Sequence, residues 1–241
     1  MSTSKSTVLN FLSKYKMVLI HVAALASGLL LLIQYLTGSL NAYPIQEITF
    51  RTGKTALILL MISLSMTPLK TITGWSWTAT VRKWAGLYAF FYAFSHMLVF
   101  VWWDYGFAWQ YILPQIFSKR YLLVGASAIV ILFLMAFTSY QWWVKRLGRG
   151  WTYLHRFVYV AGVLVVLHYA WVQKGDLFTL QGNVLQPFLF ALYFILLMVL
   201  RIPFIRRKIV QSRRARARTN QPQNGPVVVR RTRPSSGAQG E

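Results

Sequence analysis

The sequence predicts an all-α fold, a polytopic membrane helix bundle with six transmembrane helices and both termini cytoplasmic. Three observations predict it. Hydrophobic residues make up 56% of the 241-residue chain, and charged residues only 12%. Apolar stretches repeatedly approach the roughly 20 residues that a helix needs to cross about 30 Å of hydrocarbon. Lys and Arg gather in alternate loops, as they do in loops that stay in the cytoplasm.

Each of the six spans is placed by its apolar run. They cover residues 17–36, 55–69, 84–103, 121–139, 152–171 and 184–204. The first run is too long for the apolar core of a cleaved signal peptide, and no convincing small-residue cleavage site follows it. The second is short, because Lys54 precedes it and Pro68 lies near its end. Trp102 and Trp103 close the third, as the aromatic belt of a membrane interface predicts.

Positive charge sets the orientation of the bundle. Most of the 26 Lys and Arg residues fall in the amino terminus, the second and fourth loops and the carboxyl-terminal tail. The other three loops hold Glu47, Asp104 and Asp176, which are all the acidic residues except Glu241 at the end of the chain. Because cytoplasmic loops carry the excess of Lys and Arg, we expect both termini in the cytoplasm.

The chain divides into three parts: a cytoplasmic amino-terminal segment (1–16), a transmembrane domain (17–205) and a basic tail (206–241). The tail is rich in Arg, Gln, Pro and Gly, which predicts disorder. Its arginines between 206 and 218 are expected to lie against the anionic headgroups of membrane lipid. A net charge of +22 would suggest nucleic acid in a soluble protein. No aromatic residue interleaves this tail, so we expect no nucleic-acid binding.

The chain has no cysteine, which excludes several kinds of cofactor site. Disulfides, thiolate-bound iron–sulfur clusters and covalently attached c-type haem all need cysteine. Imidazole is the only strong nitrogen ligand left, so any haem must be held non-covalently. The sequence also has no Walker A loop and no Gly-rich dinucleotide fingerprint after a strand.

Four histidines, His21, His96, His155 and His168, lie in or at the rim of the apolar spans. An ionisable side chain at membrane depth is costly and indicates function. His96 and His168 each precede an acidic outer-loop residue by eight positions, so both are expected at one level near the outer face. His21 and His155 follow basic inner residues closely and lie about 20 Å deeper toward the cytoplasm.

A haem standing between helices needs two imidazoles at one depth, on opposite faces of the ring. His96 and His168 meet this condition and are predicted to ligate haem iron. His155 projects about 140° away from His168 on an ideal helix, so it is expected to turn toward the first helix and His21. His155 is predicted to be an inner ligand of haem iron, and His21 is a ligand only if a second haem exists. The alternatives are a structural or propionate-contacting role for His155 and a hydrogen bond from His21 to a carbonyl or headgroup. Cations that would suit haem propionates are Arg82, Lys83, Arg149 and Arg156 at the inner level and Arg51, Lys54 and Arg120 at the outer level.

Five short runs resemble the MsrQ (YedZ) family over about residues 15–205. They are Thr52-Gly-Lys-Thr-Ala, Met66-Thr-Pro-Leu, Arg82-Lys-Trp-Ala-Gly-Leu, Phe137-Thr-Ser, and the run from Leu147 through Gly-Arg-Gly-Trp-Thr-Tyr-Leu to His155, with His168-Tyr following. The resemblance implies a haem-binding subunit of the bacterial inner membrane, of the ferric-reductase-like transmembrane group. It implies that electrons from the quinone pool or a cytosolic flavin reductase pass through haem b to a periplasmic molybdenum-containing subunit, MsrP. MsrP would then repair oxidised methionine. FMN is carried over on the resemblance alone.

The ligands implied by the resemblance depart from the wider ferric reductase pattern. That pattern has two histidines on the third helix and two on the fifth. Here Lys83 stands 13 residues before His96, where the second histidine of the third helix would be. The chain is therefore expected to hold one haem or two, with His21 the only histidine left to complete a second site beside His155. No cytosolic FAD and NADPH domain like that of related oxidases is recognised in this sequence, so the electron donor is expected to be a separate protein or a quinol.

Two other functions remain open from the sequence. One is a membrane ferric reductase that delivers electrons to external iron. The other is a transporter or channel that uses its intramembrane histidines as a proton relay.

Overall fold

The computed structural model describes residues 3–173 and 185–219, and over these residues all regular structure is helical. The helices are α1 (Thr3–Leu36), α2 (Pro44–Thr73), α3 (Thr78–Leu98), a π-helix η1 (Val99–Asp104), α4 (Trp109–Ser118), α5 (Arg120–Phe137), α6 (Gln141–Leu147), α7 (Arg149–Arg156), α8 (Val158–Val172), α9 (Leu185–Val199) and α10 (Pro203–Thr219). The all-α fold is as the sequence predicts.

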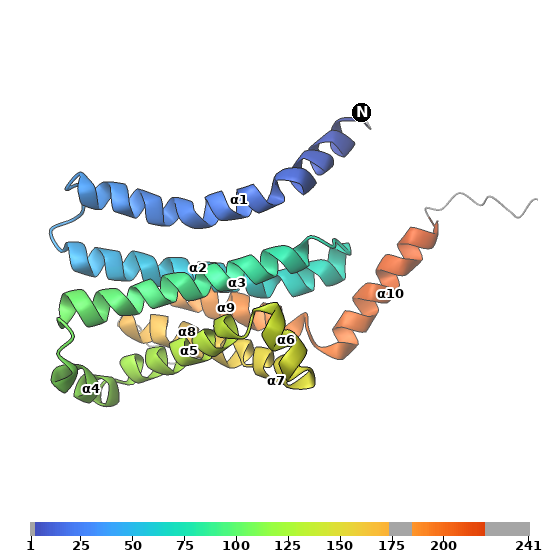
Figure 1. Ribbon diagram of the computed structural model, residues 1–241. Helices are drawn as coiled ribbons and strands as arrows, with labels where there is room; N and C mark the ends of the chain where they lie inside the picture. The colour runs from blue at the N-terminus through green and yellow to red at the C-terminus, as the bar shows by residue number, and fades with distance from the viewer. Residues whose placement is uncertain (1–2, 174–184, 220–241) are drawn as a thin grey trace, which may run out of the picture.

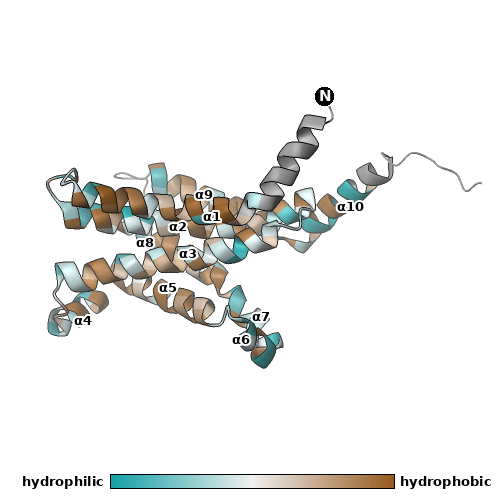
Figure 2. Ribbon diagram, turned by 45° about the horizontal axis from the view of Figure 1, so that its top comes forward, coloured by the Kyte–Doolittle hydropathy of each residue, from teal (hydrophilic) through white to brown (hydrophobic). Residues whose placement is uncertain are grey.

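Five segments are long and apolar enough to cross a membrane, and a sixth is obtained if the bent pair α9–α10 counts as one span. Many of their large apolar side chains face outward. Leu29, Leu30 and Leu32 of α1, for example, are each more than half exposed. Figure 2 shows apolar residues along the bundle and polar residues at its ends. Outward-facing apolar side chains are what a lipid environment requires, so the chain is a multi-pass membrane protein.

The bundle is built around two helix pairs. α2 packs along α3, and α5 packs along α8; α1 lies on the outside of the α2–α3 pair (Figure 1). The buried core joins the two pairs. Its members include Leu57, Leu60 and Leu64 of α2, Ala89 and Tyr92 of α3, and Ala161 and Val166 of α8. This packing fixes the facing surfaces of α3 and α8, on which two of the predicted ligands lie.

α2 is much longer than the predicted span 55–69. It begins at Pro44, which suits a first helical turn because no N–H is needed there. It also continues past Pro68, which has no N–H to give to the carbonyl of Leu64, four residues earlier. That carbonyl accepts a hydrogen bond from Nη2 of Arg201 instead. The helix is therefore not broken at Pro68, and it ends at Gly74 with a left-handed C-cap (φ 80°).

The tail differs from its prediction. The composition predicts disorder from residue 206, but α10 continues to Thr219. Arg, Lys, Ala and Gln are good helix formers, and Pro203 suits the first turn. Nη1 of Arg213 also lies 3.2 Å from the carbonyls of Lys70 and Thr71, which ties α10 to the end of α2. Residues 220–241 lie outside the described residues, as do Asp176 and the start of the sixth predicted span.

The predicted fourth loop contains the short helix α6 and the start of α7, which continues into the predicted span 152–171, and the predicted third loop contains α4. The start of α1, the α6–α7 segment and α10 lie at one end of the bundle, and α4 and the α1–α2 connection lie at the other (Figure 1). The basic and acidic loops are thus separated by the length of the bundle. That the basic end faces the cytoplasm stays a prediction.

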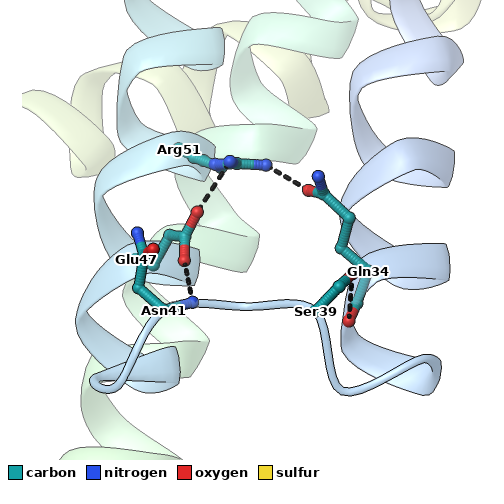
Figure 3. A network of polar contacts seen from close by, with 5 residues as sticks. All are labelled: Gln34, Ser39, Asn41, Glu47 and Arg51. Carbon is teal, nitrogen blue, oxygen red and sulfur yellow. Dashed lines mark hydrogen bonds and ion pairs between the residues drawn. The ribbon is translucent and has the colours of Figure 1, made fainter.

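A polar network closes the α1–α2 connection at the acidic end (Figure 3). Glu47 forms an ion pair with Arg51 at 2.6 Å and accepts a hydrogen bond from the main-chain N–H of Asn41 at 2.8 Å. Arg51 also donates from Nη1 to the side chain of Gln34 on α1. Ser39 donates to the main-chain carbonyl of Gln34 at 3.4 Å. The network orients the first turns of α2, which lead to the site described next.

Candidate functional site

Two histidine rings meet between the α2–α3 pair and the α5–α8 pair. His96 lies in the last turn of α3, and His168 lies near the C-terminal end of α8. Their ring centres are 6.0 Å apart, and their planes cross at 85°. Both residues are half-buried. The structure therefore brings together the two histidines that the sequence places at the outer level.

A main-chain carbonyl holds one nitrogen of each ring. Nδ1 of His96 lies 2.8 Å from the carbonyl of Thr49 on α2, and Nδ1 of His168 lies 2.8 Å from the carbonyl of Tyr121 on α5. A carbonyl oxygen can only accept a hydrogen bond, so each ring is protonated at Nδ1 and donates from it. The lone pair of each Nε2 is then available to a metal. Metal-ligating histidines are commonly oriented in this way.

A glycine lies against each ring. A Cβ added at Gly53 would lie 3.0 Å from Nδ1 of His96, and one added at Gly125 would lie 2.7 Å from Nδ1 of His168. Both distances are shorter than ordinary van der Waals contact. Each glycine stands one helical turn after the residue whose carbonyl accepts the hydrogen bond. Without a side chain at this point, the ring can approach the neighbouring helix closely enough to reach that carbonyl.

The two halves of the site repeat one another in sequence. In each half, 47 residues separate the histidine from the residue that supplies the carbonyl. The second half follows the first by 72 residues, as from His96 to His168 and from Gly53 to Gly125. The same offset relates Lys83 of α3 to His155 of α7. The repeat is therefore complete at the outer level, where both halves carry histidine, and incomplete at the inner level.

The composition of the pair favours haem over a bare metal ion. Within the described residues, no cluster of three or more His, Cys, Asp or Glu side chains is placed to hold a metal. A protein zinc site needs three or four ligands, whereas a porphyrin supplies four and needs only two from the protein. Two axial bonds of about 2 Å, plus the distance from each ring centre to its nitrogen, add up to roughly 6 Å. The observed separation of 6.0 Å agrees with this sum.

His155 has different surroundings at the inner level. Its ring stacks on Trp151, with centres 4.0 Å apart, and its Nε2 lies 3.3 Å from Oγ1 of Thr138. The Thr138 hydroxyl donates its proton to the carbonyl of Leu134 at 2.7 Å, so it accepts from the histidine. Nε2 of His155 is therefore the protonated nitrogen. Arg82 is close enough to interact electrostatically with the ring. Unlike the outer pair, His155 does not leave Nε2 available.

His21 lies against α3 rather than beside another histidine. Its Nδ1 is 2.7 Å from Oη of Tyr88, and its ring meets Trp84 edge-on with the centres 4.6 Å apart. α1, which carries His21, and α7, which carries His155, lie on opposite sides of the α2–α3 pair (Figure 1). The structure therefore does not bring His21 and His155 together.

Two of the three outer cations, Arg51 and Lys54, already have protein partners. Arg51 binds Glu47 and Gln34 as described above, and Nζ of Lys54 lies 3.2 Å from Oε1 of Gln186. Both cations flank Gly53 on α2 and hence lie near the outer pair. For these two cations to bind haem propionates, their existing contacts would have to rearrange.

Sequence reasoning missed the parts of the site that are not ligands. It did not identify Gly53 and Gly125. It also did not identify Thr49 and Tyr121, whose main-chain carbonyls accept the hydrogen bonds from the two rings. A comparison of the chain with itself at an offset of 72 residues would have aligned the two glycines as well as the two histidines. The acceptor positions leave no such sequence signal, because every residue carries a main-chain carbonyl.

Comparison with known proteins connects this geometry to named relatives. Residues 52–166 match the model of a family described as ferric reductase like transmembrane component. The matched segment includes Gly53, His96, Gly125 and His155 and ends two residues before His168. No solved structure matches the chain.

Curated relatives cover most of the chain. A protein of Herminiimonas arsenicoxydans is 38% identical over 168 residues, which is 69% of this chain and 75% of the relative. One from Xanthomonas campestris pv. campestris (strain 8004) is 39% identical over 184 residues, covering 76% and 79%. One from Xanthomonas axonopodis pv. citri (strain 306) is 41% identical over 165 residues, covering 66% and 76%. Each is named protein-methionine-sulfoxide reductase heme-binding subunit MsrQ.

Proposed function

Because this chain belongs to the family of MsrQ heme-binding subunits, we propose that it carries electrons across the membrane through haem b. The haem is held by His96 and His168. The observation that carries the proposal is the matched orientation of these two rings. Each donates from Nδ1 to a carbonyl at 2.8 Å, which leaves the Nε2 lone pair available on two rings whose centres lie 6.0 Å apart.

The protein's own part in this chemistry is to hold the haem and to limit its reaction with oxygen. When bound, haem supplies an iron that cycles between ferrous and ferric states. With His96 and His168 as its two protein ligands, the iron would have no open position for oxygen, which would favour electron transfer over oxygen activation. The carbonyls of Thr49 and Tyr121 fix the rotation of the two rings and raise their basicity as ligands. The membrane-spanning helices α3 and α8 place the site near one end of the bundle.

The donor and the acceptor are part of the proposal. Electrons enter from the quinone pool or a cytosolic flavin reductase and leave to MsrP, a periplasmic molybdenum-containing subunit that reduces methionine sulfoxide in oxidised proteins. The word subunit in the relatives' name supports a separate catalytic partner. This assignment makes the chain the electron-transfer half of an oxidoreductase system in the bacterial inner membrane. FMN is proposed as a second cofactor from the family resemblance, with no residue assigned to it.

The surroundings of the inner histidines favour a single haem. A second haem ligated by His155 and His21 would require the His155–Thr138 hydrogen bond to break. It would also require ligands from two helices that lie on opposite sides of the α2–α3 pair (Figure 1). Nothing comparable stands in the way of the outer pair.

The direct test is spectroscopic. The purified full-length protein should be red, with a Soret band and an alpha band that shift when dithionite reduces it. Electron paramagnetic resonance of the oxidised form should give the low-spin signal of bis-imidazole ligation. A colourless protein that cannot be reconstituted with haem would contradict the proposal and leave proton relay by histidine as the alternative.

A second test separates the proposed partner from external iron. Protein reduced by dithionite in liposomes is mixed with purified MsrP and methionine sulfoxide, or with a ferric chelate, and reoxidation of the alpha band is followed. Fast reoxidation that depends on MsrP supports the relay. Rapid reoxidation by the chelate, with no response to MsrP, would instead identify a membrane ferric reductase.

A further inference from the structure

The elbow between α9 and α10 contains a cavity of about 310 Å³, far from the outer histidines. α9 ends at Val199, α10 begins at Pro203, and the two axes differ by 70°. The lining residues are Arg201, Pro203, Arg206, Arg207 and Val210. Three of the five are therefore permanently charged, and they gather around one small space.

No carboxylate of the described chain neutralises this cluster. The sequence has only four acidic residues. Glu47 and Asp104 lie at the opposite end of the bundle, and Asp176 and Glu241 fall outside the described residues. Guanidinium groups that share a cavity repel one another unless an anion lies among them. The positive charge at the elbow therefore favours an anion from outside the described part of the chain.

The orientation of α10 also favours a bound anion at the elbow. The first turn of a helix presents unpaired main-chain N–H groups and a partial positive charge, which favours anions and disfavours cations. Arg206 closes that first turn and Arg207 begins the next, and their charges add to that of the helix end. A bound anion would reverse this unfavourable arrangement, because helix N-termini bind phosphate groups well.

Arg201 is held in place on one side of the cavity. It donates from Nη2 to the carbonyl of Leu64, and its guanidinium lies 4.9 Å above the centre of the Tyr159 ring. Its Nε–H is buried and has no hydrogen-bond partner in the described part of the chain. Arg82 interacts with it electrostatically, which adds another positive charge. A fixed, incompletely satisfied arginine is the kind of residue that a specific anion site contains.

We propose that the elbow is a site for the phosphate head group of one anionic phospholipid. The apolar surface beside the cavity favours a lipid over a soluble phosphate. Leu196, Ile202 and Phe204 are each 46–64% exposed around the elbow. Acyl chains would cover these side chains while the phosphate meets the arginines, and a free phosphate ion would leave them uncovered. The site is discrete, with one lipid per chain, in contrast to diffuse attraction of a basic tail to a membrane.

The test titrates full-length protein in a neutral detergent with phosphatidylglycerol, and separately with phosphatidylcholine, and counts bound lipid by native mass spectrometry. One saturable phosphatidylglycerol adduct is expected. Arg206→Gln with Arg207→Gln should weaken it about tenfold or more, because each cation contributes substantially to headgroup binding. Val210→Trp, which fills the cavity without changing charge, should weaken it similarly.

The matched control is Arg230→Gln with Arg231→Gln, which removes the same charge from the tail and should leave the adduct within about twofold of the parent. Equal weakening by both double variants, or equal binding of the two lipids, would overturn the site in favour of diffuse attraction. Displacement of the lipid by excess inorganic phosphate would overturn the assignment to a lipid. Val210→Trp keeps the test decisive if the arginine variant fails to fold.

Discussion

Arg201 supplies to α2 the hydrogen-bond donor that Pro68 lacks. The carbonyl of Leu64 would accept from residue 68 in a regular helix, but proline has no N–H, and Nη2 of Arg201 takes its place. In lipid, a main-chain group left unpaired is expensive, so a proline in a membrane helix needs such a substitute. The contact also fastens the α9–α10 elbow to α2.

This relationship predicts that the two residues are coupled in stability. Arg201→Ala should lower the free energy of unfolding by about 1–3 kcal/mol, because it leaves a half-buried carbonyl unpaired. In a Pro68→Ala background, the new N–H can bond to Leu64, so the cost of Arg201→Ala should fall by roughly 1 kcal/mol. Denaturant titration in detergent micelles measures both. An identical cost in the two backgrounds would show that Arg201 does not replace the missing donor.

Glycine substitutions should affect haem affinity in the order of their contacts. Gly125→Ala places a methyl group 2.7 Å from Nδ1 of His168, and Gly53→Ala places one 3.0 Å from Nδ1 of His96. Displacing either ring breaks its bond to the carbonyl, and losses of such partners typically cost 10- to 100-fold in metal affinity. We expect the larger loss at Gly125. Gly150→Ala is the control, because nothing lies within 4 Å of its added Cβ. Haem titration of apoprotein would measure the affinity of all three variants. Equal affinities would contradict the proposal that Gly53 and Gly125 make room for the histidine rings.

The histidine variants should fall into two classes. His96→Ala and His168→Ala each remove one axial ligand and should abolish the bis-imidazole spectrum. His21→Ala and His155→Ala should keep it, with about one haem per chain as in the parent protein. Pyridine haemochrome assay against protein concentration gives the ratio. Two haems in the parent, reduced to one by His155→Ala, would establish an inner haem and refute the single-haem proposal.

Membrane orientation can be tested without altering native thiols, because the chain has no cysteine. Ser118, at the end of α4, and Ser76, between α2 and α3, are both exposed and lie at opposite ends of the bundle. If the basic end faces the cytoplasm, a membrane-impermeant maleimide should label Ser118→Cys in spheroplasts and should label Ser76→Cys only after permeabilisation. The reverse pattern would show that the bundle is inverted.

The outer pair was accessible to sequence reasoning because charge and helical rise together measure depth. His96 and His168 each stand eight residues before an acidic loop residue, and the structure places them 6.0 Å apart. The inner level was harder, because depth does not indicate which side of a helix a ring occupies. Helical phase directed His155 toward His21, but the ring instead lies against Trp151 and Thr138.

Element ends were predicted less well than element existence, for physical reasons that involve distant residues. Pro68 ordinarily indicates the end of a helix, and only the donor from Arg201 lets α2 continue. The basic composition of 206–219 indicates disorder, yet Arg213 finds acceptors at the end of α2. In both cases a hydrogen bond between residues more than 130 positions apart changes the local outcome.

The use of main-chain carbonyls to orient the two histidines has a consequence for how this family can vary. A carbonyl belongs to the backbone, so replacing the side chain of Thr49 or Tyr121 does not remove the acceptor. The acceptor itself therefore sets no requirement on the side chain at these two positions, although the ring of Tyr121 also lies 6.4 Å from that of His168. Selection on ring orientation acts on Gly53 and Gly125 instead, where any added side chain would meet the ring. A search for divergent relatives should weigh the spacing between glycine and histidine above the identity of the acceptor residues.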